Sequence, residues 1–258
     1  MPRWTVFPYA GDFKLTMTGL KRNWARLHRG DALPLPKSPE VLQAWLLFHN
    51  GDFQSAARAG LDCDEPDGIT VANKATCVYA AYLEKKEKAK LDLFLDVAER
   101  ARAQCVADPT CGSAWYWHAY ALARYSQGIS VAKALAQGLG SKVKESLERA
   151  IALQPTHSDA HIALGAFHAE VIDKVGSLIG NMTYGAKKDI SLKLFEQALQ
   201  IHPDSIIGRL EYANALMMLD GDKRSAEATA LYQKAAATAP RDATERLEVD
   251  TANNALAD

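Results

Sequence analysis

Prolines recur at nearly regular intervals along this chain, and each follows a stretch of apolar residues with helical spacing. They are Pro66, Pro109, Pro155, Pro203 and Pro240, and consecutive members lie 43, 46, 48 and 37 residues apart. Proline cannot continue a helix, because it has no backbone N–H and its ring clashes with the preceding turn. A helix-ending signal that repeats with this period predicts a stack of similar helical units, a solenoid.

Residues that begin helices follow these prolines. Ser158, Ser205 and Asp242 stand where N-cap side chains are expected, and Asp242 opens a run Asp-Ala-Thr-Glu that fits a capping box. Ser38 precedes Pro39, which places a proline in the first turn of another helix. Between these signals apolar residues recur at three and four positions, and alternating strand-like runs are nearly absent. We therefore expect an all-α chain in which each proline closes a hairpin of two helices.

The residue types inside the repeat are similar to those of the tetratricopeptide family. In that family the first helix carries a small residue, and the second carries an aromatic ring beside it. The fourth unit has Gly165 on its first helix and Phe195 on its second, and the first, third and fifth units carry comparable residues. The second unit, residues 69–109, matches least well. The resemblance implies about five stacked helical hairpins, in which each pair buries its apolar face against its neighbours.

Two of the units are longer than the usual pattern. Ala119 and Leu147 of the third unit are 28 positions apart, and Gly165 and Phe195 of the fourth are 30 apart. Each spacing exceeds the family pattern by about a dozen residues. The additional residues, 129–142 and 171–187, form either hairpin ends that project from one edge or a lid over the inner surface. Residues 158–240 resemble bacterial tetratricopeptide proteins related to the regulators of microtubule dynamics, which share these long hairpins.

The expected organisation has three parts. Residues 1–37 form a leader with a short helix, residues 38–240 form the repeat domain, and residues 241–258 form a C-terminal capping helix. Leu20, Trp24 and Leu27 are spaced like one face of the leader helix. Terminal helices of this kind are needed in a solenoid, because the outermost repeat otherwise leaves its apolar face in water.

Charge and composition argue against several classes of protein. The chain has 30 Lys and Arg against 31 Asp and Glu, and it lacks the basic excess that nucleic-acid binding needs. No apolar run approaches the roughly 18 residues of a membrane helix, and residues 1–13 do not resemble a signal peptide. We therefore expect a cytoplasmic protein without a membrane span. The 4 cysteines lack the paired spacing of zinc sites and are expected to be free thiols.

In tetratricopeptide proteins the first helices line a concave face that binds extended peptides or helices. Alignment of the units places these residues on that face: Trp45, Phe48, His49, Tyr116, Tyr120, Arg124, Ile162, Glu170, Asn214, Met217 and Met218. Exposed aromatic and methionine side chains are typical of binding surfaces, because they offer adaptable apolar area. Alternatively, the long hairpins cover this face and the same side chains belong to the core.

Motifs of the common enzyme classes are not found: the chain has no nucleophile elbow, zinc-protease histidine pair, phosphate-binding loop or dinucleotide fingerprint. His157, His161 and His168 share one helix face, and the first two have a spacing that a metal could use. Spacing supplies no third ligand, and His161 and His168 stand where the repeat normally has a packing ring. We therefore expect neither a metal, nor a cofactor, nor a catalytic residue.

These observations favour a non-enzymatic scaffold or adaptor that holds a protein or peptide of unknown identity on the concave face. Assembly with further copies of the chain is also open. The alternative is a carrier or sensor of a small molecule, whose pocket would lie among Tyr116, Tyr120, Ile162 and residues 129–140, closed by the long hairpins.

Overall fold

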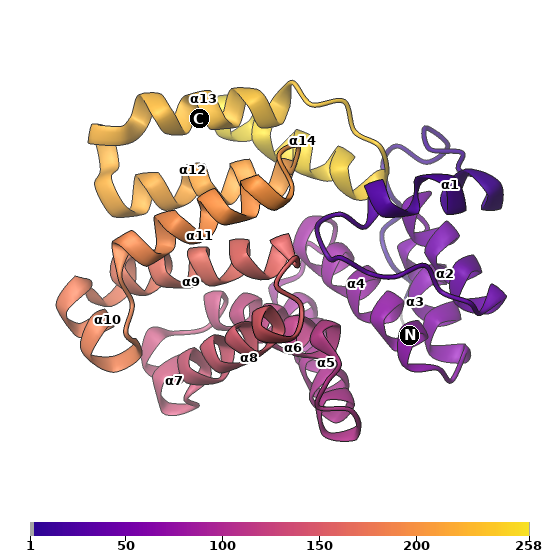
Figure 1. Ribbon diagram of the computed structural model, residues 1–258, viewed down its shortest axis with the longest axis horizontal. Coiled ribbons are helices and arrows are strands. Elements are labelled where there is room, and N and C mark those ends of the chain that lie inside the picture. The colour runs from indigo at the N-terminus through magenta and orange to yellow at the C-terminus, as the bar shows by residue number, and fades with distance from the viewer. Residues whose placement is uncertain (1–2, 258) are drawn as a thin grey trace. The chain divides into compact units, whose positions relative to one another are not determined.

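The computed structural model describes residues 3–257, and every regular element in this range is a helix (Figure 1). Residues 1, 2 and 258, which fall in the predicted leader and capping segments, lie outside the described residues. Within the described range five helix pairs follow one another: α2 (Pro39–His49) and α3 (Phe53–Asp62), α4 (Pro66–Tyr82) and α5 (Glu87–Ala107), α6 (Gly112–Gln127) and α8 (Leu139–Leu153), α9 (Ser158–Val175) and α11 (Lys188–Ile201), and α12 (Ile206–Asp220) and α13 (Ser225–Ala236). The expected all-α architecture of five hairpins is confirmed.

The remaining elements lie at the ends and inside the longer hairpins. Helix α1 (Met17–Leu27) precedes the pairs, and α14 (Ala243–Ala257) follows them. Helix α7 (Val131–Ala136) lies in the third hairpin and α10 (Ser177–Tyr184) in the fourth, within the segments expected to be additional. A 3-10 turn, η1 (Gly221–Arg224), joins the two helices of the fifth hairpin.

The chain divides into two compact units, which we describe separately. The first comprises Met1–His28, Leu33–Ser146 and Arg241–Thr244, and the second comprises Arg29–Ala32, Leu147–Pro240 and Glu245–Asp258. In the first unit α2 packs on α4 and α4 on α6, and in the second unit α9 packs on α12. Stacking of successive first helices is the step of a helical solenoid. The boundaries of these two units differ from those of the predicted parts, residues 1–37, 38–240 and 241–258. The predicted division stays a prediction.

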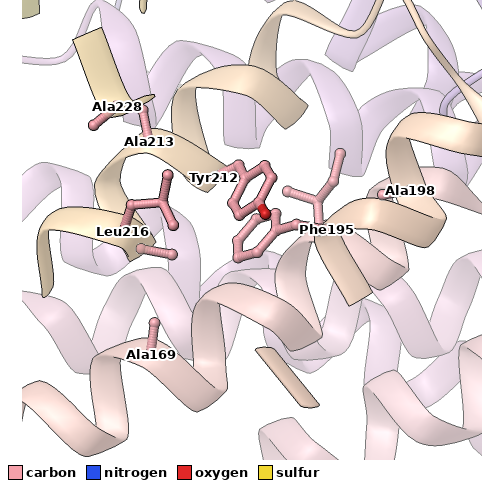
Figure 2. Packing of buried hydrophobic residues seen from close by; sticks show 9 residues of the cluster. Ala169, Phe195, Ala198, Tyr212, Ala213, Leu216 and Ala228 are labelled. Carbon is pink, nitrogen blue, oxygen red and sulfur yellow. The ribbon is translucent and has the colours of Figure 1, made fainter. Parts of the chain in front are cut away.

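The second unit is built around the contact between Gly165 and Phe195. A Cβ atom on Gly165 of α9 would lie only 3.0 Å from Cε2 of Phe195, so the missing side chain lets α11 approach closely. The Ser191 hydroxyl of α11 donates to the Gly165 carbonyl at 2.7 Å. Phe195 is fully buried, and its ring lies beside that of Tyr212 in a cluster that α9, α11, α12 and α13 share (Figure 2). This is the small-residue and ring arrangement that the repeat pattern predicts.

Helix α14 covers the last hairpin of the second unit. Val249 and Ala252 of α14 are buried against Ile206 and Leu210 of α12 and Ala235 of α13. In the first unit Leu20 and Trp24 of α1 are buried, and the Trp24 indole donates to the Leu33 carbonyl at 2.8 Å. Both terminal helices therefore bury apolar side chains as expected.

The helix boundaries confirm some of the expected signals and correct others. Ser38 and Ser205 cap α2 and α12, accepting from the amides of Val41 and Gly208. Pro66, expected to close a helix, instead occupies the first turn of α4, where its missing N–H leaves no broken hydrogen bond. The other four recurring prolines follow the second helices α5, α8, α11 and α13.

The start of α9 also differs from the expectation. His157, not Ser158, is the N-cap, and its Nδ1 accepts from the Ala160 amide at 3.2 Å. The Ser158 hydroxyl is buried and donates to the Ala198 carbonyl of α11 at 3.0 Å. Because the His157 side chain already accepts from a free amide at the start of the helix, the Ser158 hydroxyl can make this bond to α11 instead.

Candidate binding surface

Three of the predicted surface residues are buried in the first unit. Trp45, Phe48 and His49 of α2 are 1%, 0% and 0% exposed. The prediction that they line an open face is wrong. Helix α1 and its C-cap residue His28 cover Trp45, because the Trp24 and His28 rings lie edge-on to Trp45 with centroids 5.9 and 4.5 Å apart.

A lysine covers the same aromatic cluster from the side of α4. The Lys74 Nζ lies 5.6 Å from the ring centroid of Trp45 and 5.5 Å from that of Phe48. Such a cation is attracted by the negative faces of aromatic rings, and its alkyl stem packs on them. The ring of Phe53 in α3 completes the cover, 5.5 Å from Phe48 and edge-on to it. These contacts make the α2 aromatics part of the core.

His49 takes part in a buried polar chain. Its Nδ1 lies 2.6 Å from Oδ2 of Asp242, and its Nε2 lies 3.2 Å from Nε2 of His28. All three side chains are buried. Because a carboxylate accepts, the His49 Nδ1 carries the proton toward Asp242, and one further proton lies between the two Nε2 atoms. This arrangement ties residues 241–244 to α1 and α2 of the first unit, so His49 has a structural role.

Three aromatic side chains of α6 pack against one another. The Tyr116, Trp117 and Tyr120 rings contact one another with centroids 4.9 to 6.0 Å apart. The Arg124 guanidinium lies 5.2 Å from the ring centroid of Tyr120. Tyr116 is buried, whereas Tyr120 and Arg124 are half-buried. The latter two are the candidates that remain in the first unit.

The predicted residues of the second unit divide in the same way. Ile162 is buried in the cluster around Phe195, whereas Glu170 at the far end of α9 is half-buried. Asn214 is half-buried, and its Oδ1 accepts from the Tyr232 hydroxyl of α13 at 2.5 Å. Asn214 is thereby held against the second helix of its own hairpin.

Met217 and Met218 stand apart from the other predicted residues because they are exposed. Their exposed fractions are 37% and 39%, and they lie side by side near the end of α12. Leu210, Ala213 and Leu216, which precede the two methionines on this helix, are buried. Methionine is flexible and polarisable, and proteins use it on surfaces that adapt to a partner. We call these two residues the α12 methionine pair.

The three histidines, His157 at the N-cap of α9 and His161 and His168 within it, each have a hydrogen-bond partner in the chain. His157 caps the helix, the Nδ1 of His161 lies 3.0 Å from the His157 carbonyl, and the Nδ1 of His168 accepts from the Lys187 amide at 3.3 Å. Among the described residues no group of three His, Cys, Asp or Glu side chains is placed to hold a metal ion. The spacing that suggested a metal therefore serves helix capping and loop attachment.

The cysteines are free in the described chain, and their surroundings disfavour thiolate formation. Burial raises the pKa of Cys77 strongly and raises that of Cys105 to about 11. Burial also raises the pKa of Cys63 and of Cys111. A thiol with a raised pKa is a poor nucleophile at neutral pH, because the thiolate is the reactive form.

One small hollow lies in the first unit beside the α2 aromatics. Its volume is about 10 Å³, and its lining includes Trp24, Pro34, Trp45 and Thr70. That space corresponds to roughly one water molecule and is too small for an organic ligand. No helix among the described residues is long and apolar enough to span a membrane.

The additional segment of the fourth hairpin was not among the predicted sites, and it carries exposed apolar side chains. Leu178, Ile179 and Met182 of α10 point outward, so they do not line an interior pocket. The sequence signal that could have identified them is three large apolar residues between Gly176 and Gly185 in a stretch without carboxylates.

Comparison with known proteins identifies the family of the chain. The sequence model of the family described as Regulator of microtubule dynamics protein 1-3 matches residues 62–258. The chain belongs to this family. Membership confirms the resemblance recognised in residues 158–240 and extends it toward the N-terminus as far as Asp62, the last residue of α3.

A solved structure agrees with the fold of this family member. The chain is similar to a thermophilic TPR protein of Thermus thermophilus, with a TM-score of 0.58 and 17% sequence identity. The similarity covers 83% of this chain and 97% of the other. At this identity it shows the fold alone, and that fold is the tetratricopeptide repeat. The comparison with curated proteins finds no match.

Proposed function

We propose that the chain is a non-enzymatic scaffold that holds a protein or peptide on the first-helix side of its repeats. The α12 methionine pair carries this proposal. An exposed pair of large apolar side chains at the end of an otherwise buried stripe gives a partner an anchor without disturbing the core. Proteins with tetratricopeptide-like folds generally bind other proteins, which agrees with this use.

The polar residues near this anchor suit an extended or helical partner. Asn214, one turn before Met217 and Met218, is held by Tyr232, and its Nδ2 lies 3.5 Å from Glu211. Glu170 stands on the neighbouring first helix α9 of the same unit. An apolar anchor beside carboxylates favours a segment that combines apolar and basic residues. Tyr120 and Arg124 are the corresponding candidates of the first unit.

Burial raises the pKa of each thiol, so the proposal gives no cysteine a nucleophilic role. The small-molecule alternative stays a prediction, because the hollow beside Trp45 lies outside the residues that were predicted to line its pocket. A cytoplasmic location and self-assembly stay predictions.

A peptide library displayed on phage and selected on the purified chain supplies a defined ligand for the test. The affinity of the selected peptide is then measured by fluorescence polarisation. We expect the double variant Met217→Ser/Met218→Ser to weaken binding by about tenfold or more, as loss of an apolar anchor does. Leu256→Ser on α14 is the matched control, because Leu256 is exposed to the same 39% as Met218. Equal affinity of the double variant and the wild type would refute this site.

A further inference from the structure

An irregular segment before α1 lies against the first unit, and we call residues 3–15 the strap. These residues form no helix or strand. Among residues 3–8 two side chains are buried, Trp4 at 6% and Phe7 at 3% exposure, and the other four residues are exposed. Peptide-binding proteins recognise extended segments in this way, by pockets for a few side chains and hydrogen bonds to the main chain. The strap therefore has the form of a bound peptide.

Each buried ring of the strap has its own place on the helices below. The Trp4 ring is stacked on Tyr79 of α4, with centroids 4.2 Å apart and planes inclined by 7°. The Phe7 ring lies over Gly51 in the turn between α2 and α3, where an added Cβ would come within 2.5 Å of it. Phe53 meets the Phe7 ring edge-on at 6.0 Å. We call the residues that receive the strap the strap site: Gly51, Phe53, Gln54 and Tyr79.

Two side chains of the strap site bind the main chain of the strap. The Trp4 amide donates to Oε1 of Gln54 at 3.1 Å, and the Thr5 amide donates to the Tyr79 hydroxyl at 3.3 Å. Bonds to a main chain do not depend on the sequence of the segment that supplies it. Any extended segment can therefore use them, while the two rings set the sequence requirement.

The end of the strap next to α1 is attached separately. The Leu15 amide donates to Oδ1 of Asn50 at 2.8 Å, and Nδ2 of Asn50 donates to the Leu15 carbonyl at 3.1 Å. Residues 8–14 between the two attachments are exposed or half-buried. The segment with Trp4 and Phe7 can therefore leave its site while α1 stays in place.

We propose that the strap site binds an extended segment of a partner protein with two aromatic residues three positions apart, and that the strap closes this site in competition with it. The strap and three of the four site residues precede residue 62, where the family match begins, so the family does not account for them. The strap site shares no residue with the α12 methionine pair, and the two proposals are tested independently.

Competition with the tethered strap decides which occupant the site takes. A short flexible tether gives the strap an effective concentration in the millimolar range. A second copy offers the same two rings without that advantage, so exchange of straps between copies needs protein near this concentration. A partner segment overcomes the strap by further contacts or by a tether of its own. Its measured affinity is reduced in proportion to the fraction of molecules whose strap is detached.

The probe is a fluorescein-labelled peptide with the sequence of residues 3–13, whose binding to the full chain is measured by fluorescence polarisation. It extends to residue 13 because Tyr9 and Phe13 contact the Phe7 ring. The variant Trp4→Ala/Phe7→Ala removes both rings from the strap. We expect it to bind the peptide at least about tenfold more tightly than the wild type does, because the competitor is gone.

Matched controls test the two rings and the main-chain contact. A peptide with alanine in place of Trp4 and Phe7 should not bind, whereas one with alanine in place of Val6, which is 63% exposed, should bind unchanged. Adding Gln54→Ala to the double variant should weaken binding severalfold. Gln43→Ala at an exposed position of α2 should not. Circular dichroism establishes that each variant is folded.

Native-state hydrogen exchange of the wild type supplies a test without any variant. The Trp4 and Thr5 amides should exchange by local opening, faster than the amide of Ala75 in the middle of α4 and independently of low urea concentrations. Exchange of all three amides through global unfolding alone would show that the strap does not leave its site, which overturns the proposal.

Three further results would also overturn it. One is a folded double variant that does not bind the peptide, and another is a double variant that binds it no more tightly than the wild type. The third is a wild-type dimer at micromolar concentration in sedimentation velocity that the double variant loses, since the occupant would then be the strap of a second copy.

Discussion

The ring of Phe195 lies stacked on the ring of Tyr212, with centroids 5.1 Å apart and planes inclined by 7°. Phe195 belongs to the second helix of the fourth hairpin and Tyr212 to the first helix of the fifth. This contact therefore joins successive repeats of the second unit (Figure 2). The missing side chain of Gly165 lets the Phe195 ring approach α9 closely. Neither hairpin buries its apolar face alone, so this ring should carry much of the unit's stability.

We expect Phe195→Ala to lower the free energy of unfolding by about 3–5 kcal/mol, because it opens a cavity at a fully buried ring. Urea denaturation followed by circular dichroism measures the loss. Phe167→Ala is the control, since Phe167 is half-buried on α9 and makes an edge contact with Tyr184 at 6.1 Å. A loss at Phe195 no larger than the loss at Phe167 would show that this contact does not hold the repeats together.

The loop Arg29–Ala32 belongs to the second unit, and its glycine is tightly enclosed. The Gly30 carbonyl accepts from the Asp159 amide at 3.0 Å, and a Cβ on Gly30 would overlap the Asp159 carboxylate. We expect Gly30→Ala to destabilise the protein by about 1 kcal/mol, because the Asp159 carboxylate at the end of its side chain must move aside. Gly19→Ala in α1 meets nothing closer than 3.4 Å and should be neutral or slightly stabilising. Thermal unfolding of both variants distinguishes them, and equal midpoints would contradict the close approach.

Removing the charge of Asp242 should weaken the first unit. Asp242→Asn keeps the shape but leaves His49 without its carboxylate partner, and we expect a loss of about 1.5–3 kcal/mol, as for a hydrogen bond to a charged group. Asp62→Asn at the exposed end of α3 is the control and should change stability by less than about 0.5 kcal/mol. Denaturant titrations compare the two. If both substitutions have the same small effect, the polar chain through His28, His49 and Asp242 contributes nothing to stability.

His118 makes stability depend on pH in a predictable direction. Burial lowers its pKa from 6.5, Lys142 and Arg102 add to this effect, and Glu99 opposes it. Below pH 6.5 the unfolded chain therefore binds more protons at this residue than the folded chain, so stability falls on acidification. We expect His118→Gln to flatten the stability curve between about pH 6.5 and pH 5, above the range in which most carboxylates titrate. Identical slopes for the variant and the wild type in this window would contradict the assignment.

Thiol labelling tests the cysteine environments. Iodoacetamide at neutral pH should modify native protein slowly, with buried Cys77 and Cys105 modified after half-buried Cys63 and Cys111. Burial raises the pKa of each thiol, so little thiolate is present, and access adds to the difference. Mass spectrometry of peptides from a time course measures the order, and labelling in urea should remove it. Rapid modification of Cys77 in native protein would show that the packing around this buried thiol opens locally.

The repeat was predictable because its signals are local. Gly165 and Phe195 occur in a known spacing pattern, and Ser38 and Ser205 are N-caps whose role depends only on nearby residues. Local signals do not decide whether a proline begins a helix or follows one. Pro66 and Pro109 both follow apolar stretches, yet only the structure shows that Pro66 begins a helix, because proline is tolerated in a first turn as well as after a last one.

The binding residues were less predictable because exposure depends on distant parts of the chain. Trp45 and Phe48 occupy first-helix positions, but α1 and Lys74 cover them, and nothing in the repeat pattern encodes that cover. His49 meets Asp242 across 193 residues of sequence, which no local motif reveals. Met217 and Met218 lie near the end of a first helix and are exposed, and their part in binding stays a prediction.

Contact of a partner with the α12 methionine pair is the central claim. Methionine methyl groups labelled with carbon-13 report this contact directly in NMR spectra. Met217 and Met218 of α12 are the probes, and Met17 of α1 and Met182 of α10 are the internal controls. On addition of the selected peptide, we expect the Met217 and Met218 signals to shift with saturation while the Met17 and Met182 signals do not. Saturable shifts at Met17 or Met182 with unchanged signals at Met217 and Met218 would contradict this claim.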